Sequence, residues 1–468
     1  MSDERPIVTW SEAILAYDFG PGHPLTPKRF PIGIDLLRHA GADRWAAPRE
    51  ATDDELARLH DRRYIRQVRA FSDDPWQPGR MGIGSHDVPA FHGMHEAAAM
   101  VAGGSIDAVR RILDGEASHG FNPGGGLHHA MAAQAGGFCI YNDVALAAAV
   151  ARDAGHRVLS VDLDVHHGDG TQALFADDPE VLTFSIHETG RTLYPGTGSL
   201  EEDGGPGASG TVVNLPLEPG TGDATWVEAV ERMVGALAAA YRPTFLVTQH
   251  GCDAHAWDPL AHLELTTGAW ARVTRFLDGI AHRYCDGRWF ATGGGGYDAY
   301  RVVPRSWGIV WHAQAHRELP EATPDGWQAA WAETVARETR GDALPTRWID
   351  LPGTARPEPE AVTLRGPSSE QKARKLPGRS GISTANNASR CAPISARSAT
   401  WRRRSKFMLA PQLIATNFRP EHRSRATYFL MAATASAPAG STIERVSSKI
   451  SWMPAHISSV STSSISST

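Results

Sequence analysis

The sequence is poor in cysteine and has no long apolar run. Its 468 residues contain four cysteines, which are scattered rather than paired: Cys139, Cys252, Cys285 and Cys391. This spacing excludes a disulfide framework and a thiolate zinc site. No stretch reaches the roughly 18 uninterrupted apolar residues of a membrane span, and the charged start MSDERPIVTW does not resemble a secretory signal. We therefore expect a soluble cytoplasmic protein without a membrane partner.

An overall excess of positive charge is also missing. The formal net charge is −6 at pH 7, so nucleic acid is not an expected partner. Residues 368–468, however, hold 15 of the 46 Lys/Arg and only 3 of the 52 Asp/Glu. We divide the chain into a folded domain over residues 1–365 and a basic, Ser/Arg/Ala-rich tail over 366–468, expected to be disordered or without selected function. The run RRRSK at 402–406 is interpreted as a solvated charge cluster, with a nucleic-acid arm as the alternative.

Short runs rich in β-branched residues alternate with helical patterns in the first 365 residues. The runs at 157–164, 181–186, 244–249 and 288–293 are typical of buried parallel strands. Helices are predicted from His95, Asp143 and Thr225. This alternation predicts a three-layer α/β fold. Polar and glycine-rich segments follow each strand, at the end where open α/β sheets bind ligands.

The segment VDLDVHHGDG, Val161 to Gly170, is the strongest chemical signal. Positions two apart in a strand share a face, so Asp164 and His166 are predicted to point the same way, with Asp162 deeper on that face. A carboxylate and an imidazole are typical ligands of Zn²⁺, with Fe²⁺ as an alternative. Asp253 follows another strand and is the candidate third ligand. Three protein ligands leave a position open for water, as in catalytic zinc sites.

Two further motifs supply groups for acid–base catalysis. PGGGLHHA contains the adjacent His128 and His129, and catalytic imidazoles are usually oriented by a carboxylate on the second nitrogen. Asp162 and Asp169 are the candidate partners. GGGGY ends in Tyr297, whose phenol could donate a hydrogen bond to a developing oxyanion, an interaction that contributes roughly 3 to 4 kcal/mol.

These motifs together resemble the histone-deacetylase superfamily, and most closely its bacterial acetoin-utilisation branch. PGGGLHHA, GFCIYND, VDLDVHHGDG, YPGTG, GCDAHAWDPL and GGGGY occur in the order of that family, and the similarity runs from about residue 18 to 311. The resemblance implies an arginase/deacetylase-like domain with a central, mainly parallel eight-stranded sheet and a channel leading to the metal.

The resemblance also implies roles for individual residues. Asp164, His166 and Asp253 correspond to the zinc ligands, and Tyr297 to the catalytic tyrosine. His128 would be backed by Asp162, and His129 by Asp169. The substrate would contact Asp87 at the rim and a wall formed by Gly137, Phe138, Tyr194 and Leu260. A monovalent cation, usually K⁺, would bind the side chains of Asp162, Asp164, His166 and Ser185 and the backbone of Ile186.

The function implied is hydrolysis of acetylated amines by water activated on the metal. Neutral His129 is expected to take the proton of the water, although the sequence leaves open how His128 and His129 divide the acid and base roles. Acetylated lysine on a protein, such as an acyl-CoA synthetase, is the preferred substrate, by analogy. Acetylpolyamines are the enzymatic alternative, and a non-catalytic regulatory module is a third. An arginase-like pair of Mn²⁺ ions is disfavoured by His128, His129 and Tyr297.

Overall fold

The buried β-branched runs form one parallel sheet. In the computed structural model, which describes residues 5–358, the four predicted strands are present as β4 (Val158–Asp162), β5 (Val181–Glu188), β7 (Phe245–Gln249) and β8 (Trp289–Thr292). Every residue of these strands is buried, as expected where helices cover both faces of a sheet. The remaining strands are β1 (Ile7–Thr9), β2 (Trp45–Ala46), β3 (His119–Asn122) and β6 (Val212–Leu217).

The eight strands lie in the order β2-β1-β3-β8-β7-β4-β5-β6, and all their pairings are parallel. This confirms the predicted α/β class and the eight-stranded parallel sheet. Neighbours in the sheet are often distant in the chain. β3 pairs with β8, for example, and His119 lies opposite Trp289. The sheet therefore brings together loops that sequence order keeps apart.

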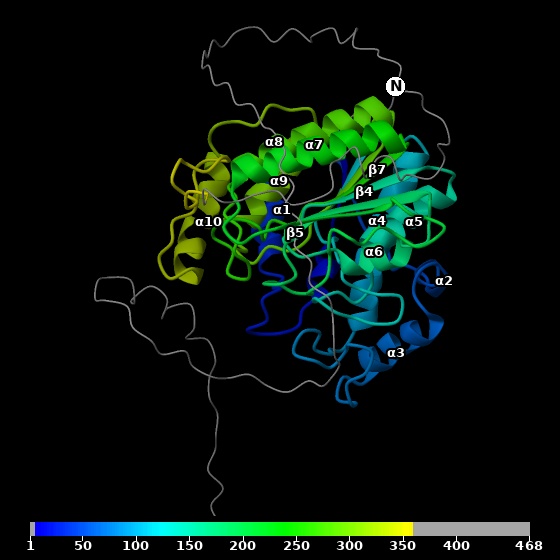
Figure 1. The fold of residues 1–468 in the computed structure, drawn as a ribbon. Helices are drawn as coiled ribbons and strands as arrows, with labels where there is room; N and C mark the ends of the chain where they lie inside the picture. Colours follow the sequence, from blue (N-terminus) through cyan, green and yellow to red (C-terminus); the bar gives the residue numbers. More distant parts are fainter. Residues whose placement is uncertain (1–4, 359–468) are drawn as a thin grey trace, which may run out of the picture. The chain divides into compact units, whose positions relative to one another are not determined.

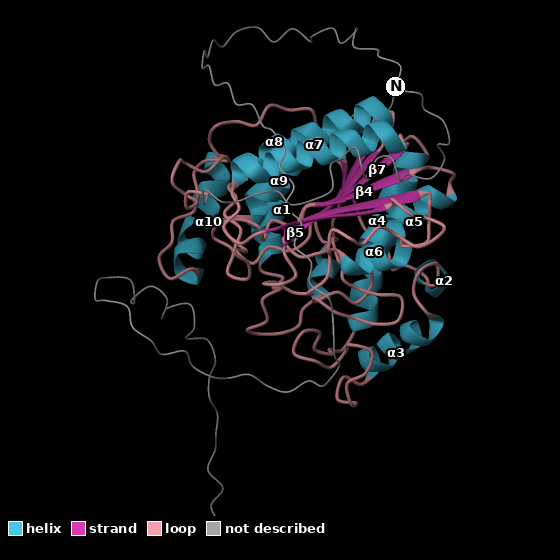
Figure 2. Cartoon of the chain, in the orientation of Figure 1, coloured by secondary structure: helices cyan, strands magenta, loops and turns pink. Residues whose placement is uncertain are grey.

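Helices cover both faces of the sheet (Figures 1 and 2). One layer contains α1 (Arg29–Ala40), α7 (Asp223–Tyr241), α8 (Thr267–Tyr284), α9 (Val303–Gln314) and α10 (Asp325–Glu338). The other contains α4 (Met94–Leu113), α5 (Asp143–Asp153) and α6 (Asp169–Phe175), with α3 (Arg62–Asp73) packed on α4. The short elements η1 (Glu12–Ala16) and α2 (Asp53–Leu56) complete the list. α4, α5 and α7 are the three helices predicted from sequence.

The helical layer around α1 depends on a close approach to α9. Gly33 in α1 faces Trp307 in α9, and a Cβ at position 33 would lie 2.5 Å from Cε3 of the indole. Trp307 is fully buried, so its indole ring cannot move away from such a Cβ. Glycine at this position therefore sets how closely the two helices pack.

One predicted boundary is wrong in detail. β4 ends at Asp162, so Asp164 and His166 lie in the turn that follows and not on the strand. Beyond the end of β4, Leu163 donates its N–H to the carbonyl of Gln249 in β7, and the carbonyl of Val165 accepts the N–H of Glu188 in β5. The predicted tail and its RRRSK run lie outside the described residues. Among residues 5–358, no helix is both long and apolar enough to cross a membrane.

Candidate active site

Four loops meet at the carboxyl edge of four adjacent strands. β3, β8, β7 and β4 are neighbours in the sheet, and parallel strands end on the same side. The loop after β3 contains His128 and His129, and the loop after β8 contains Tyr297. The loops after β7 and β4 contribute Asp253 and the Asp164–His166 pair. The predicted residues from separate parts of the chain are therefore brought to one place.

Asp164, His166 and Asp253 form a compact group of potential metal ligands. All three are buried, and one donor atom from each lies within 4.8 Å of the other two. Nδ1 of His166 lies 3.0 Å from Oδ1 of Asp164 and 3.1 Å from Oδ2 of Asp253. Two carboxylates and one imidazole at this spacing match the donor set of Zn²⁺ and other borderline divalent metals.

Hydrogen bonds from the backbone and from the Gln249 side chain orient both carboxylates. Oδ2 of Asp164 accepts hydrogen bonds from Nε2 of Gln249 at 2.7 Å and from the N–H of Gly295 at 2.8 Å. Oδ1 of Asp253 accepts from the N–H of Val165 at 2.9 Å. Outer hydrogen bonds of this kind orient metal ligands and tune their affinity. The residues present therefore fit a divalent cation.

Gly295 is required by the space around these carboxylates. A Cβ at position 295 would lie 2.0 Å from Oδ2 of Asp253 and 2.8 Å from Oδ2 of Asp164. Any side chain here would displace both acids. The glycine run of GGGGY is therefore more than a flexible turn, because it lets the backbone touch the candidate ligands.

His128 and His129 each have their own carboxylate. Nδ1 of His128 lies 2.7 Å from Asp162, and Nδ1 of His129 lies 2.7 Å from Asp169. Because carboxylates accept, both Nδ1 atoms carry a proton. The two Nε2 atoms lie 3.1 Å apart, and a hydrogen bond between them requires one imidazole to be protonated at both nitrogens.

The surrounding charges give the two imidazoles different pKa values. Burial lowers the pKa of His128, but the carboxylates of Asp162 and Asp164 outweigh it and raise the pKa to about 9. Burial and the neighbouring His128 lower the pKa of His129 to about 4. His128 is thus the charged donor and His129 the neutral acceptor near pH 7. A cation held by Asp164 would offset part of that carboxylate's charge and lower both pKa values.

Tyr297 lies beside the ligand group. Its ring packs edge-to-face on Phe138 with centroids 5.8 Å apart, and its N–H donates to Oδ2 of Asp258 at 2.8 Å. Burial and the charges of Asp253 and Asp164 raise the pKa of the phenol well above its usual value near 10. The phenol therefore keeps its proton and can act as a hydrogen-bond donor.

The predicted substrate wall is found in part around the histidines. The N–H of Gly137 donates to Asp87 at 2.7 Å, and a Cβ at Gly137 would lie 2.1 Å from Cδ2 of His129. The Tyr194 ring, 46% exposed, packs edge-to-face on His129 with centroids 5.0 Å apart. Leu260 is half-buried, and its N–H donates to Asp258. Leu260 is thus connected to this region through Asp258, which also accepts the N–H of Tyr297.

The residues predicted for the monovalent cation also lie close together. Asp162 and Ser185 are direct neighbours in the β4–β5 register, and Ile186 follows in β5. Gly168 lies between the first two: its N–H donates to Oγ of Ser185 at 3.4 Å, and a Cβ would lie 2.2 Å from Oδ2 of Asp162. Asp164 and His166 follow β4 directly.

Several supporting residues escaped the sequence analysis. Asp258 lies in GCDAHAWDPL, and Gln249 ends a predicted strand, so their positions offered a weak signal. Asp143 accepts the N–H groups of Gly126 and Leu127 and so holds the loop before the histidines. Buried Arg29 in α1 donates to the carbonyl of Gly294 at 2.7 Å. Nothing in its local sequence indicates this contact.

Comparison with known proteins agrees with this geometry. The model of the histone deacetylase domain matches residues 23–314, which is more than half of the chain and contains all the candidate site residues. This chain belongs to the histone deacetylase family. The deacetylase is also 39% identical over 351 residues to the acetoin utilization protein AcuC of Bacillus subtilis, covering 74% of this chain and 89% of that protein.

Other relatives point the same way. AcuC of Staphylococcus xylosus is 35% identical over 349 residues, with 73% of this chain and 89% of that protein covered. Among solved structures, the HD domain of HDA15 superposes with a TM-score of 0.61 at 29% identity, covering 71% of this chain and 95% of that one. The deacetylase is thus a hydrolase of acetylated substrates from a metal-dependent family.

Proposed function

We propose that the deacetylase hydrolyses acetylated lysine side chains of proteins, with Asp164, His166 and Asp253 holding a Zn²⁺ ion. The observation that carries the proposal is the buried three-ligand group beside two adjacent imidazoles, each held by its own carboxylate. When bound, the metal supplies Lewis-acid chemistry: it polarises the acetyl carbonyl and makes the attacking water more acidic. Fe²⁺ would fit the same donors.

The protein's own groups would then move the protons. His129 is neutral, with its Nδ1–H fixed on Asp169, and its Nε2 would exchange the hydrogen bond from His128 for the proton of the attacking water. The resulting imidazolium is a strong acid beside charged His128, and it readily protonates the leaving amine. His128 acts mainly as a positive charge held by Asp162.

Tyr297 would complete the site by stabilising charge on the acetyl oxygen. Its phenol keeps a proton that it can donate as the carbonyl oxygen becomes negative. Phe138 and Tyr194 would hold the aliphatic stem of the substrate between aromatic rings. Asp87, already bound to the N–H of Gly137 through one oxygen, would accept a substrate amide with the other. K⁺ at Asp162 and Ser185 would add structural support.

A substrate panel tests this proposal. The chain loaded with Zn²⁺ or Fe²⁺ is assayed on acetyl-lysine peptides, including one from an acyl-CoA synthetase, and on acetylputrescine and acetylspermidine. We expect the peptides to have the highest kcat/KM. Preference for the polyamines would reject the protein substrate, and a metal-replete chain inactive on every acylamide would reject catalysis.

A further inference from the structure

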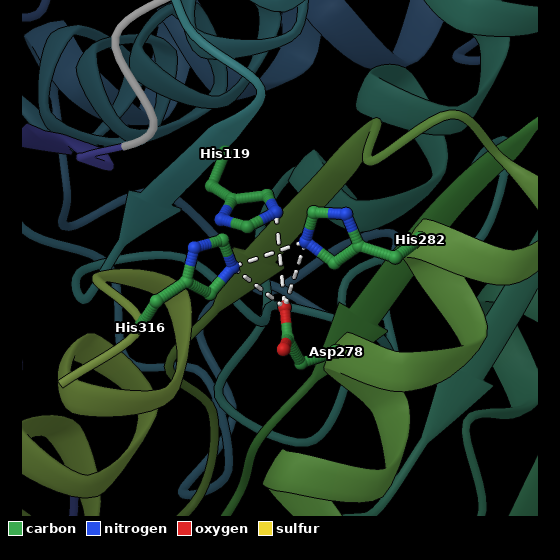
Figure 3. Close-up of side chains that lie close together, drawn as sticks. All are labelled: His119, Asp278, His282 and His316. Carbon is green, nitrogen blue, oxygen red and sulfur yellow. Dashed lines mark hydrogen bonds and ion pairs between the residues drawn. The ribbon is translucent and has the colours of Figure 1, made fainter. Parts of the chain in front are cut away.

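A second cluster of metal-binding side chains lies at the opposite edge of the sheet. His119 begins β3, whereas the catalytic histidines follow the end of that strand. Asp278 and His282 lie one turn apart in α8, and His316 lies in the turn after α9. Together they form one of the two groups of potential metal ligands found in residues 5–358, the other being the candidate active site. Figure 3 shows the three imidazoles arranged around the carboxylate of Asp278.

The distances in this cluster suit a tetrahedral ion. Four donors bonded at the ~2.0–2.1 Å typical of zinc stand roughly 3.3–3.4 Å from one another. Oδ1 of Asp278 lies 3.4 Å from Nε2 of His282, 3.3 Å from Nε2 of His316 and 3.9 Å from Nε2 of His119. The Nε2 atoms of His282 and His316 are 3.0 Å apart. Nε2 of His119 is the donor farthest from Asp278, and all four donor atoms lie within 4.8 Å of one another.

His119 shows a feature that hydrogen bonding within the cluster does not explain. Its side chain is fully buried, and its Nδ1 lies 2.7 Å from the carbonyl of Gln314, to which it must donate. In the neutral imidazole, Nε2 then carries a lone pair. This atom is buried and makes no hydrogen bond among the described residues. It faces an oxygen of Asp278, so two acceptors point at each other (Figure 3).

This arrangement is the one that metal-binding histidines adopt. Such residues donate the second ring N–H to a carbonyl or carboxylate, which fixes the tautomer and aims the other nitrogen at the ion. The side chains of His282 and His316 are 42% and 29% exposed, so an ion can enter from solvent.

We propose that His119, Asp278, His282 and His316 form a second divalent-metal site, selective for Zn²⁺ and similar borderline metals. Four protein donors fill a tetrahedron, which is typical of structural rather than catalytic zinc. The ion would tie the start of β3 to α8 and to the turn after α9. It would thus stabilise the edge of the sheet opposite the catalytic loops, and the proposal does not depend on the substrate of the deacetylase.

The test counts metal ions per chain. Full-length protein is stripped with a chelator, incubated with Zn²⁺, desalted and analysed by mass spectrometry of the metal. We expect two ions per chain in the wild type and one in the double variant His282→Ala, His316→Ala. Both replaced side chains are partly exposed, so the variant should fold. Equal numbers of ions in the wild type and the double variant would overturn the proposal, whereas one ion in the wild type and none in the variant would support this site and count against the candidate active site.

The chain offers a matched control. Asp35 and His39 form another Asp–His pair one turn apart on a helix, with Nδ1 of His39 3.5 Å from the carboxylate. They belong to neither group of potential metal ligands in the described residues. His39→Ala should therefore still hold two ions. Loss of an ion from this control would show nonspecific binding and would equally overturn the proposal.

Two further readouts separate this site from the active site. Co²⁺ in a tetrahedral site absorbs visible light, and the wild type should show a band component that is absent from the double variant. The double variant loaded with Zn²⁺ should keep its deacetylation rate within about twofold of the wild type. Identical Co²⁺ spectra would contradict a second tetrahedral site even if deacetylation itself were normal.

Discussion

At the scale of single residues, the division of work between His128 and His129 depends on their neighbours. His128 faces two carboxylates, Asp162 at 2.7 Å and Asp164 at 3.9 Å, whereas His129 faces Asp169 and the charge of His128. Of two chemically identical side chains, one is therefore charged and the other neutral near pH 7. Pairs of titratable groups whose pKa values are driven apart are typical of acid–base sites.

Replacing His128 should shift the pH profile of the deacetylase. Burial and His128 together lower the pKa of His129 to about 4, so His128→Ala removes a positive charge and raises that pKa. As the pH is lowered, His129 then becomes protonated at a higher pH than in the wild type. The acidic limb of the kcat/KM profile should therefore move to higher pH. The profile is measured with excess metal present. An unmoved acidic limb would contradict the assignment of His129 as the base.

Removing the phenol of Tyr297 should depress turnover without loss of metal. The Tyr297→Phe variant keeps the ring contact with Phe138 but cannot donate to the acetyl oxygen. We expect kcat to fall about 10²- to 10³-fold, or roughly 3 to 4 kcal/mol in the barrier. Metal analysis serves as the control, since the ligands are untouched. Unchanged turnover would reject the oxyanion role.

At the scale of secondary structure elements, the loop after β7 is held by a residue that lies far along the chain. His255, two residues after Asp253, lies 2.8 Å from Asp350, which also accepts from the N–H of Thr267 at the start of α8. Nη1 of Arg305 in α9 donates to the other oxygen of Asp350 at 2.7 Å. The segment after α10 thus connects two helices to a loop of the candidate site.

Asp350→Ala should destabilise the fold by about 3–5 kcal/mol, because it leaves the buried guanidinium of Arg305 uncompensated. The side chains of Arg305 and Asp350 are only 1% and 2% exposed. Urea denaturation measures the free energy of unfolding. Glu228→Ala is the control, since its pair with Arg232 is exposed and should contribute less than about 1 kcal/mol.

The same pair predicts a dependence on pH. Burial by itself raises the pKa of Asp350, but the hydrogen bond from His255 and the charge of Arg305 outweigh it and hold the pKa well below its usual value of 3.8. A lowered pKa stabilises the fold above the usual value, and this contribution is lost as the pH falls toward the folded-state pKa. The difference between wild type and Asp350→Ala should therefore narrow below about pH 4. A constant difference would contradict the ion pair.

At the scale of the whole molecule, the carboxyl edge of the sheet concentrates buried negative charge. Asp164 and Asp253 are both fully buried within the ligand group, and each needs positive charge nearby. A metal ion that binds the folded chain but not the unfolded chain stabilises the fold by mass action. The stabilisation is about 4 kcal/mol when the free metal concentration is 1,000 times the dissociation constant.

Chelation should therefore lower the Tm of the deacetylase by several degrees, and Zn²⁺ should restore it. The double variant His282→Ala, His316→Ala isolates the effect of the candidate active site in this scan. Mg²⁺ should restore little, because it prefers an all-oxygen shell and the group includes His166. Equal Tm values with and without Zn²⁺ in this variant would contradict metal binding at Asp164, His166 and Asp253.

The fold class, and which candidate site residues lie together, could be predicted largely from the sequence. Buried β-branched runs predicted four strands, and polar motifs at their ends predicted which residues would meet, because parallel strands end at one edge. The short strands β1, β2 and β3 escaped because two to four residues carry no measurable periodicity. The end of β4 was placed too late because buried Leu163 continues the apolar pattern past the last strand residue.

The tertiary structure alone decided the contacts that depend on long-range packing. Arg29 reaches Gly294 and Asp350 reaches Arg305 across large sequence separations, and no local pattern specifies such partners. The cluster of His119, Asp278, His282 and His316 was invisible for the same reason, since its members come from a strand, a helix and a turn. Local periodicity reports which face of an element is buried, whereas only the assembled sheet and helices determine which side chains meet.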